Sequence, residues 1–325
     1  MCQLIFHPHT RSTTTTTQPP PTIDLNPPLI AMTTTTIISR SLPIRLVTLN
    51  IRYATDNPSP GEEPWPARCP RLCAQLNFIT AGCGLVFVCL QEVLHSQLTD
   101  IQAHLGPAWE HIGRGRENGK EAGEYSPIFF RADRWECERH RTYWLSPTPD
   151  VPSKGWDAVL ERVVTLGSFR HRETGTSVVV MSTHFDHRGE FAREQSARLL
   201  VYLASTWPET DAGETSRPPV FIGGDFNSTP TGRAYQVLTE PGSGMRDISG
   251  LVPDEAKYGN REITYTSFGE PGEQPARIDF LFARDTERLR VLNFGILANK
   301  FDDGVFLSDH RPVVADLEIP VSTAT

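Results

Sequence analysis

The chain has 325 residues, of which 38% are hydrophobic and 22% are charged, as in an ordinary globular protein. Its formal net charge is -8, so it lacks the basic footprint of a protein that coats nucleic acid, although an enzyme that meets phosphates through a metal ion stays compatible with this charge. The cysteines end at Cys137 and show no CxxC spacing that would signal zinc. They indicate reduced thiols in an intracellular protein, and we expect the cytoplasm, with the nucleus as the alternative.

The start of the chain differs in composition from the rest. Residues 1–41 are rich in Thr and Pro and carry few charges, so we expect a disordered N-terminal tail, within which Met32 offers a second plausible start. No secretory signal is indicated, and no apolar run is long enough to cross a bilayer, so we expect no membrane partner. Residues 42–320 contain no linker-like stretch and are predicted to form one domain, followed by a short tail at residues 321–325.

Strand and helix patterns alternate in the first part of this domain. IRLVTLNIRY (residues 44–53) alternates apolar and polar residues like a half-buried strand. PARCPRLCAQLNFITAG (66–82) has helical spacing and ends at a glycine. GLVFVCLQEV (84–93) is a continuous apolar run, typical of a strand buried on both faces, and HSQLTDIQAHLG (95–106) indicates a second helix.

The second half repeats this order. Residues 176–187 and 218–227 are predicted strands on either side of a long amphipathic helix at residues 189–206. Residues 277–284 and 311–319 are predicted late strands, and short strands near Tyr125 and Arg162 fill the middle. Buried strands with helices in both halves favour two sheets packed face to face, with helices outside.

Polar residues recur at the carboxyl ends of the predicted strands, where sites in layered α/β folds gather. Any one of them is weak evidence, because Asp and Asn are common turn formers. Their repetition at successive strand ends favours a common site. The residues are Asn50, Glu92, His184, Asp186, Asp225, Asn227, Asp279, Asp309 and His310.

These residue types suit the hydrolysis of a phosphoester. A hard cation such as Mg²⁺ needs one or two carboxylates, which Glu92 and Asp309 offer, with Asn50 as a further oxygen group. Asp225 can accept a proton from the attacking water, and Asn227 can hold that water or a phosphoryl oxygen.

The developing negative charge needs donors around it, which His184, His310 and Arg162 can supply. Asp279 beside His310 would fix the tautomer of that histidine and keep it cationic.

The motifs LNIRY, LQEV, STHFDH, GGDFNSTP, RIDFLF and SDHRPV resemble those of the endonuclease/exonuclease/phosphatase superfamily, in the same order and across residues 46–314. The resemblance implies an α/β fold, a four-layer α/β/β/α sandwich of two mixed, mainly antiparallel sheets with helices on both outer faces. It also implies a phosphoesterase that uses Mg²⁺ or Mn²⁺.

The resemblance further assigns roles by motif. Glu92 is similar to the family's metal ligand, with Asn50 as its strand-end neighbour, and Asp225 and Asn227 are similar to the pair that activates water. By the same resemblance, His184 contacts phosphate or acts as an acid. Asp279 supports the last histidine, and Asp309 with His310 forms the closing pair.

Two assignments rest on shorter motifs. Tyr125 in GEYSPIFF and Arg162 in LERVVT lie where family members place a phosphate-facing tyrosine and arginine. The alternatives are a tyrosine that packs inward and a solvated arginine at a strand edge. Asp186 and His187 form either a turn with an exposed histidine or a substrate contact.

The motif set is similar to the deadenylase-like, stand-alone branch of the superfamily. The leading hypothesis is a 3′-5′ exoribonuclease-like nuclease that acts on RNA or single-stranded nucleic acid. The alternative is a phosphomonoesterase that acts on a small inositol, sugar or nucleotide phosphate. A catalytically silent binding module is disfavoured, because Glu92, Asp225 and His310 are all present.

One basic cluster bears on the choice of substrate. It suits a short or single phosphate better than a long strand, since phosphate tracking needs many cations. We expect a monomer with a phosphorylated substrate. The cluster comprises Arg114, Arg116, Lys120 and Arg131.

Overall fold

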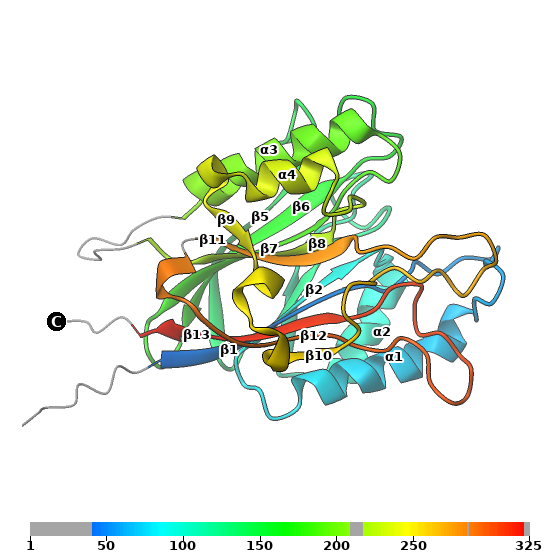
Figure 1. The fold of residues 1–325 in the computed structure, drawn as a ribbon, viewed down its shortest axis with the longest axis horizontal. Coiled ribbons are helices and arrows are strands. Elements are labelled where there is room, and N and C mark those ends of the chain that lie inside the picture. The colour runs from blue at the N-terminus through cyan, green and yellow to red at the C-terminus, as the bar shows by residue number, and fades with distance from the viewer. Residues whose placement is uncertain (1–40, 209–216, 285, 322–325) are drawn as a thin grey trace, which may run out of the picture. The chain divides into compact units, whose positions relative to one another are not determined.

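The computed structural model describes residues 41–208, 217–284 and 286–321. The predicted N-terminal tail lies outside the described residues, except for Ser41, which begins the first strand. Of the predicted tail at residues 321–325, only Val321 is described. All described residues belong to one compact unit, built from two β-sheets with helices outside them (Figure 1).

One sheet has seven strands in the order β10-β12-β13-β1-β2-β4-β3. Its neighbouring strands are antiparallel except for the pairs β1–β2 and β10–β12. In chain order the strands are β1 (Ser41–Asn50), β2 (Val86–Gln91), β3 (Trp109–Ile112), β4 (Ile128–Arg131), β10 (Lys257–Gly259), β12 (Arg290–Ile296) and β13 (Val313–Pro320).

The other sheet has six strands in the order β5-β6-β7-β8-β11-β9, of which only β7 and β8 are parallel neighbours. The expectation of two mixed, mainly antiparallel sheets is confirmed. The strands are β5 (Trp135–Trp144), β6 (Val163–His171), β7 (Ser177–His184), β8 (Val220–Asp225), β9 (Met245–Asp247) and β11 (Asp279–Arg284).

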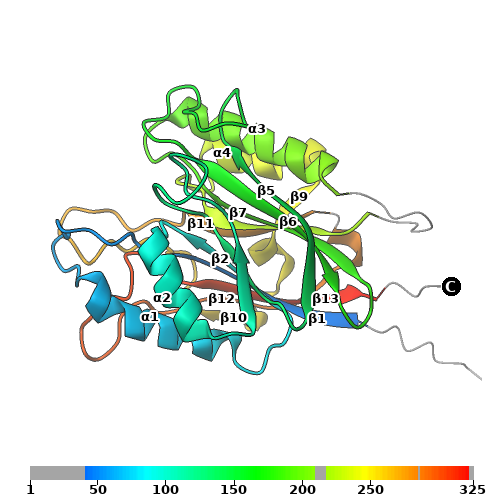
Figure 2. The same cartoon turned by 180° about the vertical axis from the view of Figure 1, so that it is seen from behind.

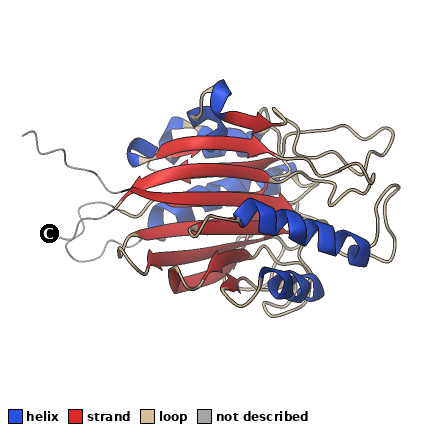
Figure 3. Ribbon diagram, turned by 90° about the horizontal axis from the view of Figure 1, so that it is seen from below, coloured by secondary structure: helices blue, strands red, loops and turns tan. Residues whose placement is uncertain are grey.

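Helices cover the outer face of each sheet (Figures 2 and 3). One apolar cluster joins α1 and α2 to the seven-stranded sheet, a second joins α3 and α4 to the six-stranded sheet, and a third fills the space between the sheets. Three buried interfaces between four layers are those of the α/β/β/α sandwich that the sequence predicted. The helices are α1 (Trp65–Thr80), α2 (His95–Leu105), α3 (Glu190–Thr206) and α4 (Arg233–Thr239).

The continuous apolar run of β2 follows from its place between two apolar clusters. Side chains alternate across a strand. Phe87 and Cys89 therefore lie in the cluster between the sheets, while Val86 and Val88 lie under α1 and α2. All six residues of β2 are buried, as the pattern predicted.

The two glycines of FIGGDFN allow β8 to pack closely against its neighbours. A Cβ at Gly223 would lie 3.0 Å from Cys89 Cβ of the facing sheet, and one at Gly224 would lie 2.4 Å from the Thr183 carbonyl oxygen. The second distance leaves no room for a side chain. This close packing brings Asp225, the last residue of β8, to the facing ends of β1 and β2.

Candidate active site

Three predicted site residues lie side by side at one edge of the six-stranded sheet. In the strand register, His184 pairs with Asp225 across β7 and β8, and Asp225 pairs with Asp279 across β8 and β11. All three residues are buried. The sequence analysis placed all three at the carboxyl ends of strands, which is wrong for Asp279, the first residue of β11. Because β11 runs antiparallel to β8, its beginning still lies beside the carboxyl end of β8.

Asn50 links this row to the seven-stranded sheet. Its Nδ2 lies 3.0 Å from Glu92 Oε1 and 3.1 Å from Asp225 Oδ2, so one amide donates to a carboxylate from each sheet. Its Oδ1 accepts a hydrogen bond of 3.0 Å from the Arg52 backbone N–H. In this arrangement Asn50 joins two carboxylates, and its Oδ1 keeps one lone pair beyond the Arg52 hydrogen bond, so its place among the metal ligands stays a prediction.

Glu92 directly follows β2 and is held as a carboxylate. Its Oε2 accepts a hydrogen bond of 3.2 Å from Tyr53 N and lies 4.0 Å from Arg52 Nη1. Burial raises the pKa of Glu92, but the Asn50 hydrogen bond and the Arg52 charge outweigh it and lower the pKa overall. Glu92 has a φ of 59°, a backbone conformation that costs of order 1–3 kcal/mol in a residue of this type and tends to occur at functional sites.

The loop before β13 carries Asp309 and His310 and is tied to β1. Ser308 Oγ lies 2.6 Å from the Asn50 carbonyl oxygen and 3.2 Å from Asp309 Oδ1. Burial raises the pKa of Asp309, and the charge of Glu92 raises it further. Glu92 and Asp309 therefore repel each other, and a bound cation would relieve this repulsion.

His310 lies between two carboxylates. Its Nδ1 is 2.8 Å from Asp279 Oδ2, the contact that the sequence led us to expect, and its Nε2 is 3.7 Å from Asp225 Oδ2. Burial lowers the pKa of His310, but the charges of Asp279 and Asp225 outweigh it and raise the pKa well above its ordinary value. His310 is therefore an imidazolium at neutral pH.

His184 lies on the other side of Asp225, among donors. Its Nδ1 is 2.9 Å from Arg162 Nη1, and its Nε2 is 3.1 Å from Asn227 Nδ2 and 3.4 Å from Asp225 Oδ2. Since a guanidinium only donates, Nδ1 must accept, which leaves the proton of the neutral ring on Nε2. This N–H is directed to Asp225 Oδ2, and the Asn227 amide nitrogen, itself a donor, is a neighbour of Nε2 and not its hydrogen-bond partner. Burial and the charges of Arg162 and Arg116 lower the pKa of His184 well below its ordinary value, so this histidine is neutral.

Asp225 lies between the two histidines. Burial and then the charge of Asp279 raise its pKa to about 7. Its Oδ1 accepts a hydrogen bond of 2.9 Å from the backbone N–H of Asn227, whose side chain also donates to the Phe185 carbonyl oxygen at 3.0 Å. Asn227 has a φ of 46°, which turns its amide back toward His184.

Sequence reasoning missed Glu124 and named its partner Arg116 only as a member of the basic cluster. The Glu124 carboxylate accepts two hydrogen bonds from Arg116, at 2.7 and 2.8 Å, and its Oε2 lies 3.9 Å from His184 Nδ1. Burial and the charge of Glu92 raise the pKa of Glu124 to about 7. Both residues lie in a glycine-rich loop without a strand pattern, and only the position of Glu124 next to Tyr125 could have drawn attention to it.

The two assignments from shorter motifs lie in different surroundings. Arg162 is buried against His184, and its Nη2 is 3.1 Å from His187 Nδ1, so it is not a solvated residue at a strand edge. Tyr125 is not brought into the cluster. It packs in the core under α1 and α2, and its hydroxyl lies 3.1 Å from His95 Nδ1, as in the inward-packing alternative.

At this site, the side chains whose ligand atoms lie close enough together to share one metal ion are not the ones predicted to bind it. Single ligand atoms of Asp225, Asp279 and His310 lie within 4.8 Å of one another, and Asp279 Oδ1 is buried without a hydrogen-bond partner. The predicted set was Glu92, Asn50 and Asp309. Both sets border the same carboxylate-rich space, which suits a divalent cation.

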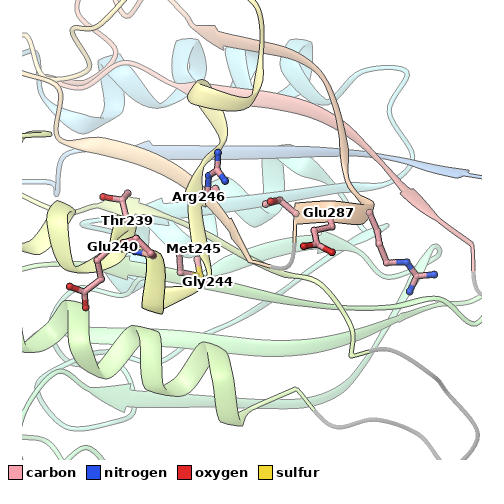
Figure 4. A pocket seen from close by; sticks show the side chains of 9 residues that line it. Thr239, Glu240, Gly244, Met245, Arg246 and Glu287 are labelled. Carbon is pink, nitrogen blue, oxygen red and sulfur yellow. The ribbon is translucent and has the colours of Figure 1, made fainter.

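A surface hollow of about 650 Å³ lies elsewhere (Figure 4). Met245, one of its lining residues, pairs with Arg284 at the end of β11, whereas Asp279 begins that strand. At roughly 3.4 Å per residue, the two ends of β11 are about 17 Å apart. The hollow is therefore separate from the candidate site.

The two-sheet sandwich and the carboxylates, amides and histidines buried at its edge define a hydrolase of phosphoric esters. The Endonuclease/Exonuclease/phosphatase family matches residues 47–310. The chain belongs to this family, as the motif resemblance indicated.

Solved structures agree with this assignment. An endonuclease/exonuclease/phosphatase from Bacteroides vulgatus is 37% identical, with a TM-score of 0.73 over 86% of this chain and 99% of that one. A mannosyl-6-phosphatase from Bacteroides thetaiotaomicron is 29% identical, with a TM-score of 0.71 over 84% and 99% of the two chains. TDP2 from D. rerio, complexed with a single-strand DNA product, is 17% identical, with a TM-score of 0.64 over 85% and 98%, and shows the fold alone.

No curated protein matches the chain. Among the described residues, no helix has both the length and the apolar character needed to cross a bilayer.

Proposed function

We propose that the chain is a divalent-metal-dependent phosphomonoesterase that hydrolyses a small phosphorylated molecule, with a sugar phosphate as the substrate class. The observation that carries this proposal is the placement of Asp225, a buried carboxylate between a cationic and a neutral histidine. A base flanked by two unlike donors can activate water and stabilise the charge that develops on phosphate.

Glu92 and Asp309 are the residues that would hold Mg²⁺ or Mn²⁺, because these cations prefer oxygen ligands and few carboxylates. His310 is unsuited to this role, since both of its nitrogens face carboxylates and it is cationic. The Asp225, Asp279 and His310 group therefore works through hydrogen bonds. When bound, the cation would neutralise charge on the phosphate.

Asp225 is the base that accepts the proton of the attacking water. Its pKa of about 7 makes it basic enough to take this proton and still largely ionised slightly above neutral pH. The Asn227 amide, fixed by the Phe185 carbonyl oxygen, orients the water or a phosphoryl oxygen beside it.

The two histidines donate to phosphate in different ways. His310 presents its Nε2–H, because its Nδ1 is bonded to Asp279. The charge of the ring strengthens the hydrogen bond from Nε2 to a phosphoryl oxygen. His184 presents the Nε2–H of a neutral ring that Arg162 holds in one tautomer. It therefore acts as a neutral donor and not as the acid that the motif resemblance allowed.

The charges near the site favour a single phosphate over a long strand. Of the four residues in the predicted basic cluster, Arg116 is paired with Glu124, and Arg131 is paired with Asp133 by two bonds of 2.8 Å each. Only Arg114 and Lys120 of this cluster remain as exposed cations. This is too little charge to neutralise the many phosphates of an RNA track.

The comparisons support the same choice. The relative at 29% identity is a mannosyl-6-phosphatase, while the match to a DNA-bound protein rests on the fold alone. These observations favour the phosphomonoesterase alternative of the sequence analysis over the exoribonuclease hypothesis.

The test is hydrolysis by the purified full chain, with Mg²⁺ or with EDTA, of hexose phosphates, inositol phosphates, a nucleoside monophosphate, a labelled oligo(A) RNA and a single-stranded DNA. We expect release of phosphate from a hexose phosphate only with the metal, intact nucleic acids, and no release by Asp225→Asn. Stepwise shortening of the RNA would restore the exonuclease hypothesis. Inactivity on every compound would contradict the phosphoesterase proposal itself.

A further inference from the structure

A second group of metal-ligating side chains lies outside the active site, between α1 and α2. The Sγ atoms of Cys69 and Cys73 are 3.9 Å apart, and a ring nitrogen of His104 lies within 4.8 Å of both. The thiols come from successive turns of α1, and His104 comes from the last turn of α2. We propose that these three side chains bind a thiophilic divalent cation such as Zn²⁺, with water as the fourth ligand.

The spacing of the ligand atoms fits this ion. With Zn–S bonds of about 2.3 Å, two sulfurs of a tetrahedral site lie about 3.8 Å apart. The two Sγ atoms already have this separation. The nitrogen of His104 needs to move by only about 1 Å, and its side chain is exposed and can turn.

Two hydrogen bonds hold the helices in register on either side of the group. Trp65 Nε1 donates to Asp100 Oδ2 at 2.8 Å, one turn before Cys69, and Asn77 Nδ2 donates to the His104 carbonyl oxygen at 3.2 Å, one turn after Cys73. Residues four apart share a helix face, so these bonds and the thiols lie on the same face of α1. The ligands from the two helices are therefore pre-positioned.

The three proposed ligands differ in burial, and the exposed one gives an ion access to the two that are buried. Cys73 is fully buried and Cys69 is 6% exposed, whereas His104 lies at the surface. An ion can therefore enter past His104 without opening the core. Burial also raises the pKa of both thiols, so the cation must displace two thiol protons when it binds.

The same helices support the loop that leads into the active site. Arg68 of α1 donates to the Ile51 carbonyl oxygen at 2.8 Å, and Gln97 of α2 donates to the Arg52 carbonyl oxygen at 3.1 Å. A cation that joins α1 to α2 would therefore stabilise the backbone next to Glu92. The inference does not depend on the reaction that the active site carries out.

The experiment is a Co²⁺ titration of the reduced full-length chain, followed by the near-ultraviolet thiolate-to-cobalt charge-transfer band. The band reports only sulfur ligands, so Co²⁺ bound at the oxygen-rich active site does not contribute to it. We expect one equivalent to develop the band and Zn²⁺ to bleach it. Zn²⁺ should also raise the melting temperature of the metal-free chain.

Variants separate this site from the other thiols. Cys69→Ser/Cys73→Ser should lose the band, and the matched control Cys83→Ser/Cys137→Ser should keep it. His104→Ala, at an exposed position that does not threaten folding, should weaken Co²⁺ binding by about tenfold or more. Absence of the band in the unaltered chain, or a band that survives in Cys69→Ser/Cys73→Ser, would overturn the proposal.

Discussion

The two histidines of the site lie on opposite sides of one carboxylate and have opposite electrostatic surroundings. His310 faces Asp279 and Asp225, which hold it as a cation, whereas His184 faces Arg162, which holds it neutral. Both rings are buried, so burial does not distinguish them. The sign of the neighbouring charge decides which one carries a proton.

This difference shows how one buried site can hold two histidines in different roles. Two adjacent imidazolium rings would repel each other, and two neutral rings would leave the phosphate without a charged imidazolium donor. Pairing one histidine with carboxylates and the other with an arginine avoids both outcomes. The comparison predicts that the two histidines respond differently to substitution.

The largest effect is expected from removing the carboxylate that both histidines share. Asp225→Asn keeps the shape of the side chain but removes the base, so kcat should fall by about 10²–10⁴-fold with little change in KM. Steady-state kinetics with the best substrate of the panel measures both constants. A fall in kcat of less than about tenfold would rule out Asp225 as the base.

The next test compares the two histidines directly. His310→Gln removes a charged donor and should reduce kcat by about 10²–10³-fold. His184→Gln removes a neutral donor and should reduce kcat by only about tenfold. If the two losses are equal, or if their order is reversed, the assignment of charge to His310 is wrong.

A smaller effect should appear in the pH dependence of Arg162→Gln. Without the guanidinium, the pKa of His184 rises toward its ordinary value, and the ring then protonates at a higher pH. The neutral form is the active one, but Asp225, with a pKa of about 7, already sets the acid limb of kcat/KM. Protonation of His184 just below this pH should therefore steepen the acid limb from a slope of one toward two, with a plateau about tenfold lower. Arg198→Gln, at an exposed position on α3, is the matched control and should leave the profile unchanged. An acid limb of unchanged slope would show that Arg162 does not set the charge of His184.

The fold could be predicted where strands carry apolar runs, and much less where they do not. β2 and β8 were found because every residue in them is buried. β5 was missed because it is an edge strand whose side chains are mostly polar and partly exposed, so that backbone pairing with β6 defines it.

The site shows a similar limit. Sequence motifs named Asp225, Asp279 and His310, which the structure brings together. The direction of the Asn50 amide and the approach of Glu124 to His184 depend on side-chain orientation and on a loop without regular structure. Neither could be derived from spacing along the chain.

The smallest effect is expected for Tyr125→Phe. This substitution tests whether Tyr125 packs into the core or contacts the phosphate. Tyr125→Phe removes only the hydroxyl that bonds to the exposed His95, so unfolding should become easier by about 1 kcal/mol or less. Since the ring still fills the core under α1 and α2, kcat/KM should stay within about twofold of the original. Thermal unfolding and kinetics on the same preparation distinguish the two readings. A loss of kcat/KM of more than about tenfold without loss of stability would mean that the hydroxyl reaches the phosphate when substrate binds, as the motif resemblance implied.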